Sequence, residues 1–213
     1  MAIAALLREN LLKAQDYLAE KEEKEKKGDL FKRDLKMESL LPVLKKELPL
    51  KAHAHRADDI MTVIRIAREF DIKVTLEHCT EGHQIAEEIA QSGFPAIVGP
   101  TLTGKTKVEL ADRGFNTPGI LAKAGVRVAI MSDHPVVPTE NLPIYAALAV
   151  KEGMPEEETL KAITINPAII LGIEDRVGSI EAGKDADIVI FDGHPLNIQS
   201  KVKGVFINGE RVL

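Results

Sequence analysis

The chain has 213 residues, of which 45% are hydrophobic and 29% charged, a balance typical of a water-soluble globular protein with a sizeable core. Its net charge of −5 argues against nucleic-acid binding, which needs a basic surface. No apolar run reaches the roughly 20 residues of a membrane span. The single cysteine, Cys79, excludes an intramolecular disulfide framework. Together these features predict a cytoplasmic protein.

Residues 1–48 form a predicted N-terminal helical region. Apolar side chains at helical spacing over 2–27 predict a first helix, which Gly28 ends. A second helical pattern covers about 34–47, although Pro42 within it favours a later start.

From residue 49 to 173 the pattern alternates between strands and helices. Strands are predicted at 49–55, 72–79, 94–100 and 125–133. Helices are predicted at 56–71, 80–93, 140–153 and 155–172, with a short helical stretch at 105–112. This order predicts right-handed βαβ units and a parallel sheet, either doubly wound or part of a (β/α)8 barrel. Short strands within 177–195 and 202–213, with no helix between them, predict a small β annex over 174–213.

Histidines and an aspartate gather at the predicted carboxyl ends of the strands. His53 and His55 end the first strand, His78 ends the second, and Asp133 and His134 end the fourth. Parallel α/β folds bind ligands at this edge, and such nitrogen and oxygen donors suit Zn²⁺ or a similar divalent ion. The pKa of a metal-bound water falls to about 7, and Asp133 is the predicted base that takes its proton. Alternatively, each histidine is only a polar residue at a strand end.

Other polar residues near this edge have two interpretations. His55 is either a metal ligand or a residue that faces the substrate, and the second is favoured. Arg56, Glu81 and His83 either contact substrate or stabilise the first turns of helices. Cys79 follows a predicted ligand, but without a second thiol in the chain a packing role is favoured.

Several segments resemble the amidohydrolase superfamily in its imidazolonepropionase-like branch, from about residue 35 to the end. They are "KAHAHRADDI", "TLEHCTEGH", "GVRVAIMSDHPVVP", "ITINPAIILGI" and, most specifically, "GSIEAGKDADIVIFDGHP". The resemblance implies about four C-terminal units of a (β/α)8 (TIM-type) barrel beside the strands of a small β-sandwich. It also implies hydrolysis of non-peptide C–N bonds in small cyclic amides, imides or related rings.

The resemblance assigns roles to individual residues. His53 is the implied metal ligand at the fifth barrel strand, and His78 is a ligand or a hydrogen-bond donor beside the metal at the sixth. Asp133, at the eighth, is implied to bind the metal and shuttle the proton. From their position at the same edge of the sheet, His55, Arg56, His83 and His134 are predicted to contact the substrate.

The stretch "GPTLTGKT", residues 99–106, fits the phosphate-binding pattern G-x-x-x-x-G-K-[ST]. A phosphate loop needs a well-formed helix after it, and the predicted helix at 105–112 has only about two turns. The resemblance makes this segment the loop after the seventh barrel strand. Nucleotide hydrolysis therefore remains a minor alternative.

The chain also departs from the family pattern. It has no His-x-His motif before residue 53 and no recognisable lysine or glutamate ligand from a fourth barrel strand. We therefore expect the C-terminal portion of a longer amidohydrolase, whether from a truncated gene, an expression product or proteolysis. Open sheet edges predict a homo-oligomer. The chain itself is expected to be weakly active or inactive, the alternative being a non-catalytic remnant that binds metal or a partner.

Overall fold

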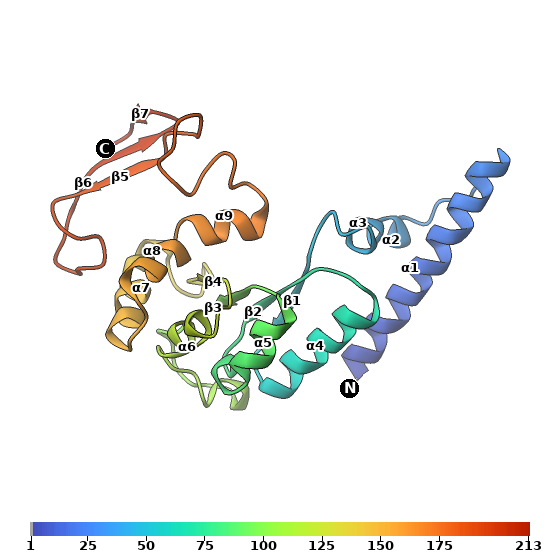
Figure 1. The fold of residues 1–213 in the computed structure, drawn as a ribbon, viewed down its shortest axis with the longest axis horizontal. Helices are drawn as coiled ribbons and strands as arrows, with labels where there is room; N and C mark the ends of the chain where they lie inside the picture. The colour runs from blue at the N-terminus through green and yellow to red at the C-terminus, as the bar shows by residue number, and fades with distance from the viewer. Residues whose placement is uncertain (1) are drawn as a thin grey trace.

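The computed structural model describes residues 2–213, with an N-terminal helix at one end and a small antiparallel sheet at the other (Figure 1). Helix α1 spans Ala2–Lys27, which confirms the first predicted helix. The second predicted helix is instead two short helices, α2 (Leu35–Glu38) and α3 (Leu41–Leu44). Pro42 lies in the first turn of α3, where its missing amide hydrogen costs no helical hydrogen bond.

Four parallel strands form the central sheet, as the sequence predicted. They are β1 (Leu50–Ala54), β2 (Val74–His78), β3 (Ala96–Val98) and β4 (Val128–Ile130), and their order in the sheet is β1-β2-β3-β4. Within residues 2–213, β1 and β4 each pair with one strand only, so the sheet is an open one in this part of the chain. Closure into a barrel remains a prediction.

Helices connect the strands and then extend beyond the last one. The connecting helices are α4 (Ala57–Glu69), α5 (Ala86–Ser92), which a 3-10 turn at Gly82–Ile85 precedes, and α6 (Thr117–Lys123). After β4 come α7 (Leu142–Lys151), α8 (Glu156–Ala162) and α9 (Ile165–Leu171). The single helix predicted over 155–172 was wrong, because the backbone of Thr164 leaves the helical region between α8 and α9.

The segment between β3 and β4 differs most from the prediction. The helix predicted at 105–112 is only a 3-10 turn, Val108–Leu110. Helix α6, which was not predicted, begins at Thr117 with Pro118 in its first turn. Pro118 does not prevent this helix, because proline is well tolerated in the first turn.

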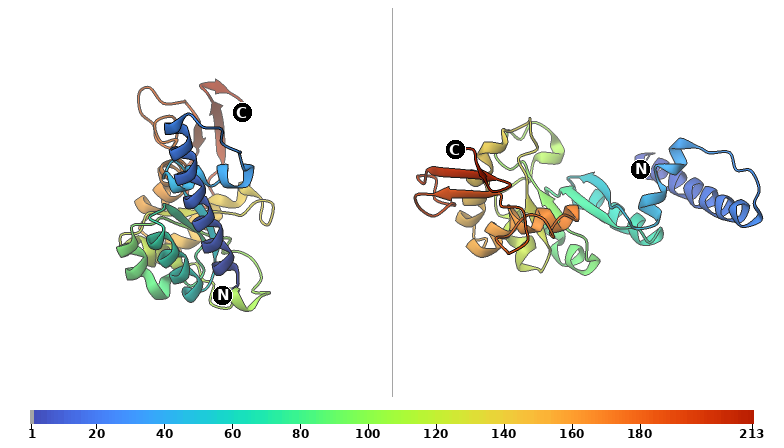
Figure 2. Two further views of the ribbon diagram at one scale, coloured as in Figure 1. Left: turned by 90° about the vertical axis from the view of Figure 1, so that its right-hand side faces the viewer. Right: turned by 90° about the horizontal axis from the view of Figure 1, so that it is seen from above.

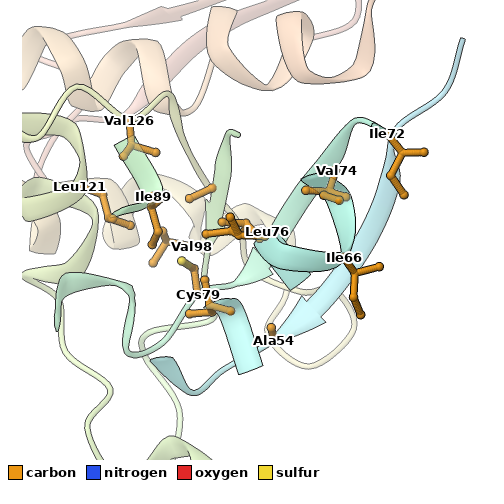
Figure 3. Packing of buried hydrophobic residues seen from close by; sticks show 14 of the residues in the cluster. Ala54, Ile66, Ile72, Val74, Leu76, Cys79, Ile89, Val98, Leu121 and Val126 are labelled. Carbon is orange, nitrogen blue, oxygen red and sulfur yellow. The ribbon is translucent and has the colours of Figure 1, made fainter. Parts of the chain in front are cut away.

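The main hydrophobic core lies between the sheet and helices α4, α5 and α6 (Figure 3). Val74 and Leu76 of β2 and Val98 of β3 point into it, together with Ile89 of α5 and Leu121 of α6. All five side chains are at most 2% exposed. This burial supplies most of the free energy that holds the strands in register, and so fixes the positions of their carboxyl ends.

The C-terminal strands form a separate antiparallel sheet, seen from two further directions in Figure 2. Its strands are β5 (Ile188–Phe191), β6 (Val202–Ile207) and β7 (Glu210–Arg211), paired in that order. The predicted strands in this region are therefore confirmed. Among residues 2–213, no helix combines the length and apolar character that crossing a bilayer requires.

Candidate metal centre

Alternation along β1 brings His53 and His55 to the same side of the sheet. In the parallel pairing of β1 with β2, His53 lies opposite Glu77, and Ala54 lies opposite His78. A regular strand would therefore turn His78 toward the side of Ala54. Instead its φ is 68°, in the left-handed region, and its ring lies with the two other histidines.

Three imidazole rings meet at the carboxyl ends of β1 and β2. The ring centroids of His53 and His78 are 4.1 Å apart, and those of His55 and His78 are 4.5 Å apart. One nitrogen from each of the three rings lies within 4.8 Å of the others. Nitrogen ligands of a tetrahedral zinc ion stand about 3.4 Å apart. Small side-chain rotations would therefore bring these donors to ligand spacing.

Two of the histidines are held by hydrogen bonds through Nδ1. The Nδ1 atom of His78 lies 2.8 Å from the carbonyl oxygen of Gly99. Because a carbonyl only accepts, this nitrogen carries the proton, and Nε2 keeps its lone pair for a metal. The Nδ1 atom of His55 lies 2.7 Å from the hydroxyl oxygen of Thr80. Such outer hydrogen bonds commonly orient histidines that bind metals.

The surroundings of His53 and His55 disfavour the protonated form of both imidazoles. Burial lowers the pKa of His55 to about 4, with further contributions from His78 and His53. Burial also lowers the pKa of His53, as does His78. The rings of His55 and His78 are buried, whereas His53 is exposed. The cluster is therefore anchored inside the protein on one side and open to solvent on the other. Neutral imidazoles with free lone pairs are the form that binds metal.

The charge of Asp133 acts on His53, but Asp133 does not join the histidine cluster. Its carboxylate acts against the effect of burial and raises the pKa of His53. No oxygen of Asp133 belongs to the group of ligand atoms within 4.8 Å. Its φ of 56° resembles that of His78, and such backbone conformations concentrate at functional sites. The roles predicted for Asp133, as ligand and base, stay predictions, and so does a substrate contact by His134, which is exposed.

The remaining predicted residues make contacts within the protein. The Nε of Arg56 donates to Oδ1 of Asp58 at 2.9 Å on an exposed surface. Glu81 accepts a hydrogen bond from the amide of Ala57, in the first turn of α4, as its helix-start interpretation predicts. His83 lies between the Thr117 hydroxyl, at 3.0 Å, and the Asp112 carboxylate, at 3.2 Å. Substrate contacts by Arg56 and His83 stay predictions.

Sequence reasoning missed the groups that orient the rings. Thr80 gave a usable signal, because it stands two residues after a histidine at a strand end. The carbonyl of Gly99 gave no signal in the sequence, because every residue type has a backbone oxygen. Lys107 and Glu109 were also missed, and both act on the pKa values of His53 and His55 after the larger effects of burial. Charges of the loop after β3 therefore influence the cluster.

The segment 99–106 lacks the features of a phosphate loop. The helical stretch that comes next in the chain is a 3-10 turn of three residues, Val108–Leu110, which is too short to provide the helix N-terminus of a phosphate loop. The ammonium of Lys105 donates to the carbonyl of Ala111 at 2.8 Å and is held by its own loop. The arrangement agrees with a connection between two strands of the sheet.

Residues 43–212 match the Amidohydrolase family. The chain belongs to this family. The match includes all four strands of the parallel sheet and all three histidines of the cluster. The resemblance inferred from the sequence is thereby confirmed.

Known proteins of the family resemble the chain over part of their own length. A crystal structure of an amidohydrolase from Thermotoga maritima superposes with a TM-score of 0.94 at 47% identity, covering 99% of this chain and 55% of that one. The imidazolonepropionase of Thermoplasma volcanium is 34% identical over 78% of this chain and 41% of its own length. The imidazolonepropionase of Treponema denticola is 31% identical over 76% of this chain and 35% of its own length. The chain thus spans less than half of these two curated relatives.

Proposed function

We propose that this chain carries part of the metal centre of a hydrolase acting on non-peptide C–N bonds of cyclic amides or imides. The cluster of His53, His55 and His78 at the strand ends carries this proposal. Three imidazoles, two of them oriented through Nδ1, suit a divalent ion of the zinc type. A solved adenosine deaminase from Xanthomonas campestris with 24% identity to this chain has bound zinc, which supports zinc as the ion.

Each residue would contribute a distinct part of the chemistry. His53 and His78 would hold the ion through one nitrogen each, and His55 either completes the set or faces the substrate. When bound, such an ion acts as a Lewis acid and lowers the pKa of water to about 7. Asp133, close enough to act on His53, would accept a proton and pass it to the leaving nitrogen. Substrate would enter on the exposed side of His53.

A homo-oligomer is the arrangement we propose for the chain. Strand β1 pairs only with β2 among the described residues, so its other edge is free to pair with another chain. At the opposite edge, the amide of Asn166 in α9 already donates to the carbonyl of Val128 in β4 at 2.8 Å. The β1 edge is therefore the better site of association. Gel filtration with light scattering measures the state directly, and a monomer at micromolar concentration would contradict this proposal.

The second candidate function is metal binding without turnover. Two observations favour it: His53 is exposed, and the chain spans only 41% of the Thermoplasma volcanium relative. Ligands from outside this chain would then be needed to complete a catalytic site. Five- and six-membered lactams, hydantoin and glutarimide, assayed with zinc-loaded protein, separate the two functions. Hydrolysis lost in His53→Ala and Asp133→Asn, and kept in His194→Ala, supports the hydrolase. Bound zinc without hydrolysis of any of these rings supports the alternative.

A further inference from the structure

Thr80 belongs to a tight turn that joins the metal centre to helix α6. The turn follows β2, and the amide of Glu81 within it donates to the carbonyl of His55, at the end of β1, at 2.8 Å. Its inner side is packed closely, because a Cβ atom added at Gly82 would stand 2.5 Å from Sγ of Cys79. The Thr80 hydroxyl, which bonds to Nδ1 of His55, is therefore carried by a turn with little room to shift inward.

Thr117, the first residue of α6, holds this turn from the opposite side. Its Oγ1 atom lies 3.0 Å from Nδ1 of His83 and 3.4 Å from the carbonyl oxygen of Thr80. Because Thr80 and His83 are only three residues apart, one hydroxyl bridges both ends of the turn. Thr117 is 1% exposed, so water has little access to compete for these contacts. Buried polar networks of this kind fix a single arrangement of the groups they join.

The carboxylate of Asp112 lies at the outer end of this network. One of its oxygens is 3.2 Å from Nε2 of His83 and also accepts a hydrogen bond from the side-chain amide of Gln84. An ionised carboxylate only accepts, so Nε2 of His83 carries a proton, and in the neutral ring Nδ1 accepts the proton of Thr117. The hydrogen bonds therefore run from Thr117 through His83 to Asp112.

We propose that Thr117 and His83 are positioning residues of the metal centre, which hold Thr80 and, through it, the ring of His55. His55 and Thr80 are 8% and 4% exposed, so the whole path from α6 to the ring lies inside the protein. Groups that hold a site histidine from outside set the direction of its other nitrogen. This proposal rests on the proposed function, in which His55 either binds the metal or faces the substrate.

Nitrogen-15 NMR of the imidazole side chains, recorded on metal-free protein, tests this positioning without metal binding or turnover. Thr117→Val keeps the shape of the side chain but removes the hydroxyl, so the nitrogen signals of His55 should shift. Thr117→Ser keeps the hydroxyl and should restore them. Thr159→Val is the matched control, because the Thr159 hydroxyl is in a residue 0% exposed but bonds to the carbonyl of Pro155. Unshifted His55 signals in Thr117→Val, or an equal shift in the control, would overturn the proposal.

Two variants of His83 keep the test decisive if Thr117→Val fails to fold. His83→Leu removes both ring nitrogens and should shift the signals of His55. In His83→Asn, the amide oxygen can stand near the place of Nδ1 and accept from Thr117, so the shift should be smaller. Equal shifts in these two variants would contradict a role for the hydrogen bond between His83 and Thr117.

Zinc binding by the original chain keeps this proposal distinct from the proposed function. If the chain binds no zinc while His55 responds to Thr117→Val, the metal centre is contradicted and the positioning of His55 is supported. If the chain binds zinc while the His55 signals stay unchanged in Thr117→Val, the positioning alone is overturned.

Discussion

The two faces of strands β1 and β2 differ in what their side chains contact. Val74 and Leu76 of β2 point into the core beneath α4 and α5 and are almost fully buried (Figure 3). On the other face, Lys51 and Glu77 form an ion pair at 3.6 Å, and His53 remains exposed. One face therefore supplies stability and the other presents polar groups. Changes on the first should lower the free energy of unfolding, and changes near the second should alter binding.

Leu76→Ala should give the largest loss of stability. The side chain is 0% exposed, and truncating a buried leucine leaves a cavity that costs about 2–5 kcal/mol. Urea denaturation followed by circular dichroism measures this free energy. Leu30→Ala is the matched control, because Leu30 is 98% exposed and its truncation should cost less than about 0.5 kcal/mol. Similar losses in both variants would refute the claim that the burial of Leu76 in the core stabilises the fold.

Cys79 should be inert in the folded protein. Burial raises the pKa of its thiol to about 12, whereas an unfolded chain has a cysteine pKa of about 8.5. The folded state thus retains the proton longer, and the resulting stabilisation is lost as the pH rises from about 8.5 toward 12. Ellman's reagent at pH 8 should react only after denaturant is added. The stability of Cys79→Ala should fall less at high pH than that of the original chain. Rapid labelling of the native chain by Ellman's reagent would contradict the claim that Cys79 is buried and inert.

Thr80→Val should weaken metal binding while the fold remains intact. The substitution keeps the shape of the side chain but removes the hydroxyl that holds Nδ1 of His55. Loss of such an outer hydrogen bond typically costs about 10- to 100-fold in metal affinity. Competition with a zinc-binding dye measures the change. Thr62→Val, at an exposed hydroxyl of α4 that bonds only to the backbone carbonyl of Asp58, serves as the control. An unchanged affinity in Thr80→Val would mean that His55 is not a ligand.

Lys51→Met should have the smallest effect. The ion pair that Lys51 makes with Glu77 is half exposed on the lysine side, and such pairs contribute about 0–1 kcal/mol. Urea denaturation at low and high salt tests this value. A loss above about 2 kcal/mol would show that the polar face stabilises the sheet as strongly as the core does.

The sequence predicted the parts of the molecule that depend on local pattern. Apolar spacing placed α1 and the four parallel strands, and the strand ends then brought His53 and His78 together. The direction of the His78 ring was beyond reach, because it depends on a left-handed backbone at a non-glycine residue. Contacts between residues far apart in the chain could not be predicted from the sequence either. The partner of His78 is a backbone carbonyl 21 residues away.

Metal content is the most direct test of the account, because its central claim is that the histidines at the strand ends form a metal centre. Purified chain would be loaded with zinc, dialysed and measured by inductively coupled plasma mass spectrometry, beside His53→Ala, His78→Ala and the distant control His194→Ala. We predict about one zinc ion per chain in the original protein and in the control, and a loss of zinc in the two cluster variants. Zinc retained in both cluster variants, or absent from the original chain, would contradict it.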